Sequence, residues 1–548
     1  MNMSKINSSI DGSNDFDFLH NLFNTLDIEN LDIVLLHTFF DLIEERGIML
    51  DDIRLKEMME KVKKMDGLRK NCELNIDNFC ILIQENSTLI KKIFTDNMII
   101  PDFQMFIKEI KRIYEKVKIN NQGVNATYIP ELAKVNSNLF GVSVCTVDGQ
   151  RFNIGDTNYG FCLQSCSKPI SYLMAVDENG FDKVHKCMGR EPSGVEFNKA
   201  ILKKISEDKE IPHNPMINAG AIMSCSMIEI GKSKADRFNK ALDVYKKLAG
   251  NTKINYQHAT FLSEQAHADR NMCLGFMMKE KNAFLDHIKN ANDLFDILDF
   301  YFQTCSIEFT CEQLSVLAAT LANGGICPIT NEKIFESENV KNCLSLMNSC
   351  GMYDYSGEWS FKVGIPAKSG VGGGIFLVIP GVMGIATFSP RLDKNGNSVR
   401  GIEFAIELTN TFNFHQYDNN LPGICKKINP TLQKNRNNQL NLMNLLFAAY
   451  EGDLSEIKKL KAEGYDILSS DYDKRTALHL AASEGKYDVL KYLVNYCKKY
   501  GMTDKIHSLD RWERTPLDDA KTKGYQKCID LLESIKPILN EIKEESES

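Results

Sequence analysis

The 548-residue sequence lacks any apolar run long enough to cross a membrane as a helix. Its most apolar segment, residues 373–388, is interrupted by Pro380, Gly381 and Gly384 and falls short of the roughly 18 residues that a span needs. Two buried strands suit this segment better. The chain also lacks a basic stripe with interleaved aromatic residues, and its formal net charge is −8. We therefore expect no membrane span and no nucleic-acid surface.

The sequence has no cysteine or histidine cluster with the spacing of a zinc site. Its 16 cysteines are scattered along the chain without a secretory signal, which predicts free thiols and no structural metal. The first thirty residues hold one basic residue, Lys5, among several acidic ones, whereas import sequences are rich in arginine. As written, the sequence predicts a cytoplasmic protein.

Three regions and a tail differ in composition. Residues 15–118 carry apolar residues at helical spacing, such as Leu19, Leu22, Phe23 and Leu26, or Val34, Leu35 and Phe39. Within this predicted helical domain, residues 66–77 resemble an EF-hand loop but lack the alternating acidic ligands that calcium needs. Residues 125–425 form a second domain, and residues 537–548, rich in Glu and Ser, a disordered tail.

The second domain has strand patterns at both ends and helical patterns between them. Residues 140–147 and 150–154 flank Asp148-Gly149, which suits the tight turn of a hairpin. Further strands are predicted at 374–379, 382–388 and 399–404. We expect one antiparallel sheet closed by distant segments, in an α+β fold.

Residues 440–536 contain an internal repeat. A phrase ending at Gly452 recurs 33 residues later, ending at Gly485, and again 39 residues later, ending at Gly524. The entry phrases Arg475-Thr-Ala-Leu-His479 and Arg514-Thr-Pro-Leu517 match the ankyrin phrase, and 33 residues is the ankyrin period. We predict ankyrin repeats in which His479 stabilises a turn, with a protein partner that the pattern does not identify.

One motif contains a possible catalytic pair of side chains. Ser165 and Lys168 stand three residues apart at the start of a predicted helix, where Pro169 suits the first turn and Gly180 the end. A helix N-terminus favours an alkoxide and disfavours a protonated lysine. A desolvated Lys168 could then accept the Ser165 proton. Ser167 is the rival hydroxyl, on a different face. Alone, this pattern is common by chance.

A second motif strengthens the first. Lys368-Ser369-Gly370 lies about 200 residues later, at the entrance to the C-terminal strands. Ser-x-x-Lys followed by Lys-[Ser/Thr]-Gly is typical of the serine β-lactamases and penicillin-binding proteins, whose strand–helix–strand order is also found here. In that fold a strand after the second motif runs beside the nucleophile. The two motifs together predict a serine hydrolase of this class.

The sequence resembles the animal glutaminases from about Tyr128 through the ankyrin region. Long phrases carry the resemblance: 161–169 (FCLQSCSKP), 213–221 (HNPMINAGA), 299–303 (DFYFQ), 321–325 (LANGG), 349–354 (SCGMYD) and 366–371 (PAKSGV). It implies a serine β-lactamase-like catalytic domain between an all-α EF-hand-like domain and ankyrin repeats. It also implies a homotetramer, activation by inorganic phosphate without another cofactor, and mitochondria as a compartment.

The resemblance further implies hydrolysis of L-glutamine to L-glutamate and ammonia through a γ-glutamyl ester on Ser165, with Lys168 as the base. Tyr353, with Tyr301, would relay a proton to the leaving amine, and the N–H groups of Ser165 and Val371 would form an oxyanion hole. The implied substrate-binding positions are Tyr128, Ser165, Asn218, Glu264, Asn271, Tyr301, Tyr353 and Val371.

Two other functions remain open on the residues alone. The first is another amidohydrolase of the same fold, acting on β-lactams or peptides. The second is an inactive protein that binds partners through its ankyrin array. Asn218 and Glu264 argue against the first, because they belong to the glutaminase pattern. The intact Ser165 and Lys168 argue against the second.

Overall fold

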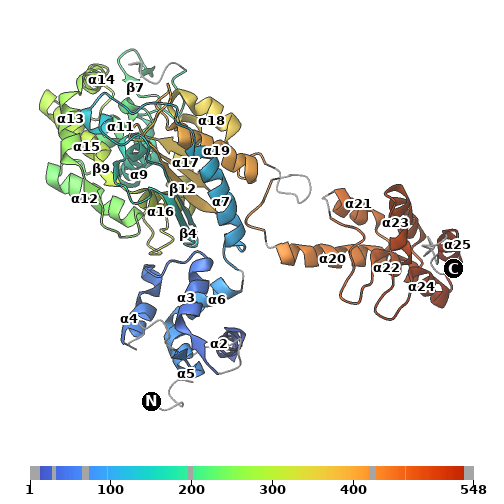
Figure 1. Cartoon of the computed structure of the whole chain (residues 1–548). Coiled ribbons are helices and arrows are strands. Elements are labelled where there is room, and N and C mark those ends of the chain that lie inside the picture. The colour runs from blue at the N-terminus through green and yellow to red at the C-terminus, as the bar shows by residue number, and fades with distance from the viewer. Residues whose placement is uncertain are drawn as a thin grey trace, which may run out of the picture. The chain divides into compact units, whose positions relative to one another are not determined.

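A computed structural model describes residues 13–26, 32–64, 73–95, 97–194, 201–418, 427–432, 434–462 and 465–535. The chain divides into two compact units, residues 1–417 and 418–548, and each is described by itself (Figure 1). The predicted C-terminal tail lies outside the described residues.

The first unit begins with short helices packed around aromatic side chains. The helices are α2 (Ser13–Leu26), α3 (Leu36–Glu45), η1 (Ile53–Leu55), α4 (Lys56–Lys64), α5 (Ile76–Ile83), η2 (Gln84–Asn86) and α6 (Ser87–Phe94). Phe39 and Phe79 meet edge to face at a centroid distance of 5.3 Å in the core of this cluster. The helical prediction is confirmed except at Val34–Leu35, which form β1 and pair with β2 (Glu73–Leu74). Residues 66–72 of the EF-hand-like loop at 66–77 lie outside the described residues.

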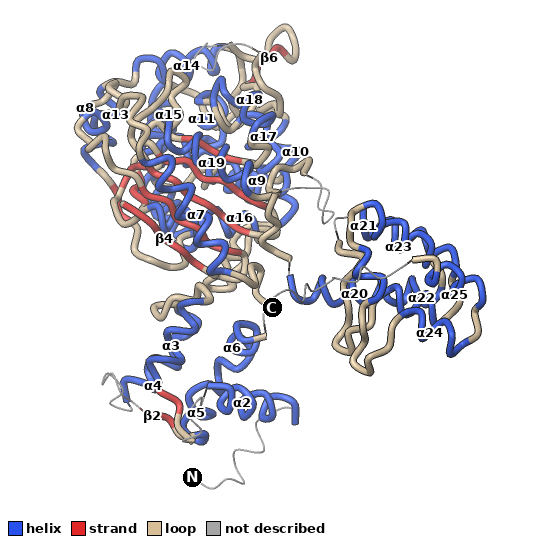
Figure 2. Tube along the Cα trace, turned by 45° about the vertical axis from the view of Figure 1, so that its right-hand side comes forward, coloured by secondary structure: helices blue, strands red, loops and turns tan. Residues whose placement is uncertain are grey.

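The predicted antiparallel sheet is confirmed. Its strand order is β10-β11-β12-β3-β4, so the N-terminal hairpin joins the C-terminal strands through β12 and β3. The strands are β3 (Gly141–Thr146), β4 (Arg151–Gly155), β10 (Ala367–Ser369), β11 (Gly374–Ile379) and β12 (Met383–Phe388). Figure 2 shows them side by side, with α7 (Phe103–Lys118) and α19 (Val399–Thr411) in front.

Helices cover both faces of this sheet. Side chains alternate along a strand, so Gly384 and Ala386 point to one face of β12 and Thr387 to the other. On the first face α16 (Cys311–Ala322) comes so close that a Cβ on Gly384 would lie 2.1 Å from the Ala319 nitrogen. On the other, Gly401 of α19 approaches Thr387. The sheet is therefore buried on both faces.

Residues 399–404 form a helix and not the predicted strand. They open α19, where Ser398 caps the helix by accepting the Gly401 N–H at 3.3 Å. The buried residues Phe404, Ala405 and Leu408 follow a helical spacing. The predicted strand is wrong because the cap at Ser398 and the helical spacing of the buried side chains favour a helix.

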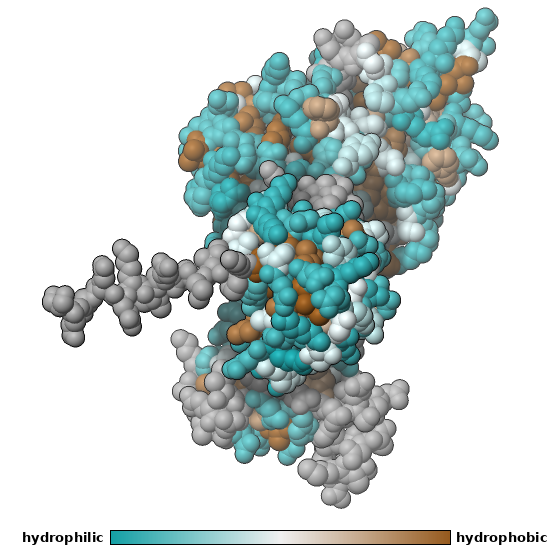
Figure 3. Space-filling model, turned by 90° about the vertical axis from the view of Figure 1, so that its right-hand side faces the viewer, coloured by the Kyte–Doolittle hydropathy of each residue, from teal (hydrophilic) through white to brown (hydrophobic). Residues whose placement is uncertain are grey.

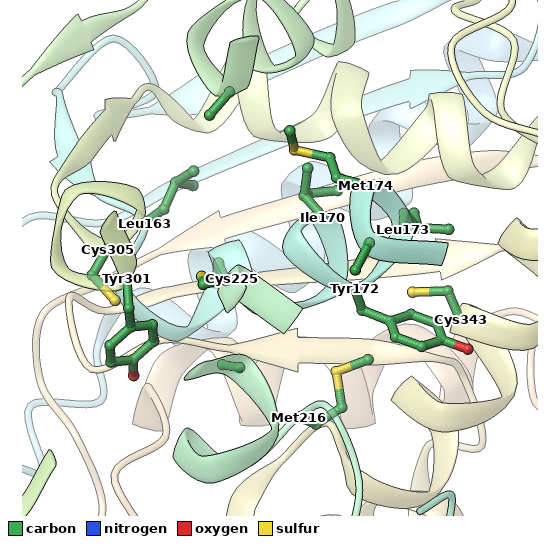
Figure 4. Close-up of a cluster of buried hydrophobic side chains, with 14 of the residues drawn as sticks. Leu163, Ile170, Tyr172, Leu173, Met174, Met216, Cys225, Tyr301, Cys305 and Cys343 are labelled. Carbon is green, nitrogen blue, oxygen red and sulfur yellow. The ribbon is translucent and has the colours of Figure 1, made fainter. Parts of the chain in front are cut away.

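The helical half of the unit surrounds one central helix, α9 (Lys168–Asn179). Residues 168–176 of α9 are all buried, as expected for a helix enclosed by others. Figure 4 shows Ile170, Tyr172, Leu173 and Met174 spreading from it into the core. The surrounding helices are α8 (Pro130–Ala133), α10 (Phe181–His185), α11 (Asn218–Ser226), α12 (Lys234–Leu248), α13 (His258–Ala266), α14 (Asp269–Glu280), α15 (Ala291–Cys305), α17 (Ser337–Cys350), η4 (Tyr353–Tyr355) and α18 (Ser356–Lys362). Two small sheets complete this half: β5 (Phe161–Cys162), β9 (Ile307–Phe309) and β8 (Asn255–Tyr256), and the pair β6 (Lys203–Lys204) and β7 (Glu210–Ile211).

The turn between β3 and β4 docks against the N-terminal helices. Arg54 donates from Nη1 to the carbonyl of Asp148 at 2.7 Å and is held by a salt bridge to Asp52 at 2.9 Å. Gln150 is fully buried and bonds the backbone of Ile100 in both directions, at 3.0 Å each. Because these groups are buried and paired, the helical cluster and the sheet form one unit.

The second unit has the paired helices of ankyrin repeats. They are α20 (Lys434–Glu451), α21 (Leu454–Ala462), α22 (Ala477–Ser483), α23 (Tyr487–Lys499), η5 (Thr503–His507), α24 (Pro516–Lys523) and α25 (Gln526–Glu533). His479 is buried: its Nδ1 lies 3.0 Å from the Thr476 hydroxyl, and its Nε2 lies 3.1 Å from the Arg514 carbonyl in the next repeat. His479 therefore stabilises the turns, as predicted.

The hydropathy of the surface and of the helices can be compared with what a membrane crossing requires. Figure 3 shows a largely hydrophilic face with small hydrophobic patches. Among the described residues, no helix combines the length and apolarity that a membrane crossing requires.

Candidate active site

Ser165 lies on a short 3-10 helix, η3 (Gln164–Ser167), directly before α9. Lys168 Nζ lies 2.6 Å from Ser165 Oγ, so the predicted pair is formed. Ser165 is half-buried, whereas Lys168 is 1% exposed. Burial is the largest cause that lowers the pKa of Lys168, because a charged amine loses hydration there. The lysine is thus suited to accept the Ser165 proton.

The rival hydroxyl of Ser167 is turned away from this pair. It is buried and donates to the Gln164 carbonyl at 2.8 Å. Gln164 itself has a φ of +49°, a strained backbone angle for a residue with a side chain. Such strain directly before Ser165 is typical of a functional turn.

Tyr301 of α15 lies next to Lys168. Lys168 Nζ lies 5.7 Å from the centroid of the Tyr301 ring. Tyr301 is buried, and burial raises its pKa well above the ordinary value, so it is a neutral phenol. Figure 4 shows Tyr301 and Cys305 extending from α15 into this part of the core.

Tyr353 is a second tyrosine at Ser165, and it also contacts Val371. Tyr353 begins η4 with a φ of +54°, and its side chain interacts with Ser165 and with the backbone of Val371. Both contacts oppose the effect of burial, which raises the pKa of Tyr353 above its ordinary range. A neutral phenol and a backbone N–H are therefore placed at the nucleophile.

Val371 lies in the turn after β10 and not on a strand. Lys368 and Ser369 belong to β10 itself, and the chain turns at 370–373 before β11. A Cβ on Gly370 would lie 2.6 Å from the Leu163 carbonyl, so only glycine allows this turn to approach the nucleophile segment. A turn, and not the predicted strand, therefore approaches the segment that holds Ser165.

Glu264 of α13 is the carboxylate of the site. The Tyr128 hydroxyl donates to Glu264 Oε1 at 2.6 Å, and Gln164 Nε2 donates to the same oxygen at 3.0 Å. Burial is the largest influence on Glu264 and raises its pKa, while these two hydrogen bonds and Lys168 lower it. The two donors favour the charged form and partly offset the effect of burial.

Gln164 is a site residue that the sequence analysis did not single out. It touches both predicted residues of this group, since its Oε1 lies 3.2 Å from the Tyr128 hydroxyl. Its position in the phrase 161–169, directly before the candidate nucleophile, was the only signal in the sequence.

Asn218 and Asn271 form a separate pair. Asn218 begins α11, Asn271 lies in α14, and the Asn218 amide donates to Asn271 Oδ1 at 3.0 Å. Both are half-buried. No described hydrogen bond joins this pair to Ser165 or Glu264, but α11 packs against both α9 and α15. The amides therefore lie on elements that support the catalytic group.

The arrangement offers acyl-transfer chemistry. A pocket of about 340 Å³ is bordered by Tyr353 and Val371 and by residues 124–127 and 392–396. In the described part of the chain, no group of three or more His, Cys, Asp or Glu side chains is arranged to hold a metal ion. The activated groups near Ser165 are instead a buried amine, two neutral phenols and a backbone amide.

Family models match three parts of the chain. The model described as glutaminase matches residues 123–417, that of an EF-hand domain residues 17–101, and that of ankyrin repeats (3 copies) residues 445–540. These three matches agree with the fold described above.

Whole proteins of the same kind are similar over most of their length. The chain is 44% identical over 513 residues to the liver isoform glutaminase, mitochondrial, of Rattus norvegicus, covering 93% of this chain and 83% of that protein. It is 42% identical over 510 residues to putative glutaminase 2 of Caenorhabditis elegans, covering 91% of this chain and 82% of that protein.

A solved structure supports the fold of the central domain. The probable glutaminase ybaS superposes with a TM-score of 0.53 at 33% identity, covering 57% of this chain and 98% of that one. With the family match and the long relatives, the Ser165–Lys168 site identifies the chain as an amidohydrolase that belongs to the glutaminase family and converts L-glutamine to L-glutamate.

Proposed function

We propose that this chain hydrolyses L-glutamine through a γ-glutamyl ester on Ser165. The observation that supports this most strongly is the 2.6 Å contact between Lys168 Nζ and Ser165 Oγ in a buried setting. Lys168 removes the hydroxyl proton as Ser165 Oγ bonds to the side-chain amide carbon of glutamine. The N–H groups of Ser165 and Val371 stabilise the negative charge on the amide oxygen, where one donor is worth about 3 kcal/mol.

Collapse of this intermediate breaks the bond between carbon and nitrogen. The proton taken by Lys168 passes to the nitrogen, with the Tyr353 phenol beside Ser165 as its relay and Tyr301 enclosing the amine, so that ammonia leaves. A water molecule then attacks the ester carbon, gives its proton to the same groups, and releases glutamate and free Ser165. Atoms and charges balance over the two steps.

Polar side chains around the nucleophile bind the α-ammonium and α-carboxylate groups of glutamine in this proposal. Glu264, whose charged form Tyr128 and Gln164 favour, is suited to the α-ammonium group of glutamine. The amides of Asn218 and Asn271 are suited to its α-carboxylate. Both ends of a free amino acid are then bound, which disfavours a peptide or a β-lactam as the substrate.

The experiment is ammonia and glutamate release from L-glutamine by purified full-length protein. We expect Ser165→Ala and Lys168→Met to lose about 10⁴-fold or more in kcat, as expected for a nucleophile and its base. Ser167→Ala, one residue from each, is the matched control and is expected to keep most of the activity. An active Ser165→Ala variant together with an inactive Ser167→Ala variant would assign the nucleophile to the rival hydroxyl.

The assembly and activator are proposed on resemblance. We infer a homotetramer activated by inorganic phosphate, as the family resemblance implies. Light scattering gives the mass in solution, and assays with and without phosphate give the activation. A monomer of full activity that does not respond to phosphate would remove both proposals.

Mitochondria are the compartment we propose, because the rat relative is named as a mitochondrial isoform. Fractionation of cells that express the chain distinguishes a mitochondrial from a cytoplasmic protein.

The ankyrin array is proposed to bind a protein partner. Its support is a set of exposed residues on the turns between repeats, where Tyr472 is 87% and Trp512 56% exposed. Ankyrin arrays bind through such extended surfaces. Crosslinking with and without Tyr472→Ala and Trp512→Ala tests this role.

A further inference from the structure

Lys368 is a buried lysine that the mechanism above does not use. It is the middle residue of β10 and is 0% exposed. Its ammonium group donates to the carbonyls of Gly351 at 3.1 Å and Ser369 at 2.8 Å. Among the described residues it forms no salt bridge with a carboxylate. Burying a charge without a counter-ion costs free energy, so the burial of this lysine needs an explanation.

The Lys368 ammonium group lies against Tyr353. Its Nζ is 4.5 Å from the centroid of the Tyr353 ring, within the range of a cation–π contact. The carbonyl of Gly351, which Lys368 holds, belongs to the turn that leads into Tyr353. The same carbonyl also accepts the Ser369 N–H at 3.3 Å. Lys368 therefore fixes both the ring and the backbone of Tyr353.

This support acts on a strained residue. The left-handed backbone of Tyr353, with φ at +54°, costs about 1–2 kcal/mol for a residue with a side chain. Such a conformation persists only where its surroundings hold it. The contacts with Lys368 hold the phenol in place against Ser165 and Val371.

The charge of the catalytic lysine also acts on Lys368. Burial and, second, the charge of Lys168 lower the pKa of Lys368 to about 7, so the two amines oppose each other's protonation. The thiols of Cys166 and Cys350 are the other titratable groups whose charges act on Lys368. The titratable groups whose charges act on Lys168 are Cys305, Cys166, Glu264 and Cys225.

The partners of the two lysines differ in which form they favour. Lys368 has two carbonyl oxygens and the face of a ring, and all three favour a charged amine. Lys168 contacts a serine hydroxyl, which can itself donate to a neutral amine, and its ring contact with Tyr301 is longer, at 5.7 Å against 4.5 Å for Lys368 and Tyr353. A proton shared by the pair is better placed on Lys368.

We propose that Lys368 is a positioning residue of the reaction, which holds Tyr353 at Ser165 and carries the positive charge that leaves Lys168 free to act as a base. This inference rests on the serine–lysine mechanism proposed above. Lys368 does not contact the reacting atoms in this account and acts through Tyr353 and Lys168.

The test compares Lys368→Met and Lys368→Arg with wild type across pH. Met keeps the length of the side chain without its charge, and Arg keeps the charge. Lys362→Met is the matched control, because Lys362 is an exposed lysine that pairs with Glu358 at 2.7 Å. The measurements are kcat and KM for L-glutamine, with the melting temperature as a check on folding.

We expect Lys368→Met to lower kcat by about 10² while KM changes less than about threefold, the range for a misplaced acid–base group. Without the Lys368 charge, Lys168 binds its proton more readily, so the acid limb of kcat moves up by about one pH unit. Lys368→Arg should keep the wild-type acid limb, and Lys362→Met should match wild type throughout.

A folded Lys368→Met variant with unchanged kcat and an unchanged acid limb would overturn the inference. So would Met and Arg variants that share the same acid limb and lose kcat equally. Should Lys368→Met not fold, lysine-selective NMR of the wild-type enzyme replaces it, with Lys368→Arg to assign the signal. The Lys168→Met variant assigns the second signal. We expect Lys368 to keep its proton to a higher pH than Lys168, and the reverse order would refute the proposal. Ser165→Ala is assayed alongside: if it stays active, the serine–lysine mechanism fails, whereas an inactive Ser165→Ala beside a normal Lys368→Met defeats only the role of Lys368.

Discussion

Replacing Tyr128 with phenylalanine removes the hydroxyl that donates to Glu264 Oε1 at 2.6 Å and leaves the ring in place. A hydrogen bond to a charged group contributes about 1.5–3 kcal/mol. Because Tyr128 is 44% exposed, water can partly replace its hydroxyl, and we take the lower end of this range. We expect kcat/KM for L-glutamine to fall about tenfold, since 1.4 kcal/mol corresponds to a factor of ten.

The same substitution should shift the pH dependence of kcat/KM in a direction that can be worked out. Glutamine binding needs the charged form of Glu264, and burial already raises the pKa of this carboxyl group. Losing the Tyr128 donor removes one of the groups that lower it, so the pKa rises further. The acid limb of kcat/KM should therefore move to higher pH in Tyr128→Phe. At saturating glutamine, kcat should change less, because the bound ammonium group keeps Glu264 charged.

The assay is initial-rate release of glutamate over a range of pH and glutamine concentration. Tyr159→Phe is a matched control, because Tyr159 is 40% exposed and stacks on Phe388 at 5.5 Å, away from Glu264. A Tyr128→Phe variant with wild-type kcat/KM, or one that loses only kcat with an unmoved acid limb, would refute the role assigned to Tyr128 and Glu264.

Two further predictions concern stability. Gly384→Ala should lower the free energy of unfolding of the first unit by about 1–3 kcal/mol in chemical denaturation, because its Cβ would meet the backbone of α16. Gly357→Ala, where a Cβ meets nothing within 4 Å, should not, and equal effects would contradict the packing described. His479→Ala should destabilise the ankyrin unit by about 1–3 kcal/mol, because a buried carbonyl and hydroxyl lose their partner. Its kcat/KM for glutamine should match wild type, and a loss of activity in the folded variant would argue against a purely structural His479.

Local patterns predicted four strands of the five-stranded sheet correctly and missed the edge strand β10. The Asp148-Gly149 turn and the apolar run at 374–388 each determine their own strands, because turn chemistry and alternation act within a few residues. The pattern at 399–404 was ambiguous, and the cap at Ser398 and the buried Phe404 and Leu408 decide for a helix. Val34–Leu35 pair with a strand about 40 residues away, which a helical spacing does not indicate.

The site was predictable where a motif names the residue. Ser165 and Lys168 are three residues apart, so local geometry already brings them together. Tyr128 and Glu264 are 136 residues apart, and only the family resemblance connected them before the fold did. Gln164 lies in a matched phrase and Lys368 in the Lys-Ser-Gly motif, but the backbone strain of Gln164 and the contact of Lys368 with the Tyr353 ring appear only in the structure.

The most direct test of the account is to find the covalent intermediate. Wild-type protein mixed with L-glutamine is quenched in acid during turnover, digested and analysed by mass spectrometry, with Ser165→Ala treated in the same way. The account predicts one γ-glutamyl group on Ser165, in the peptide that spans η3 and α9, and none in the variant. A glutamyl group on a different residue, or continued turnover by Ser165→Ala, would contradict it.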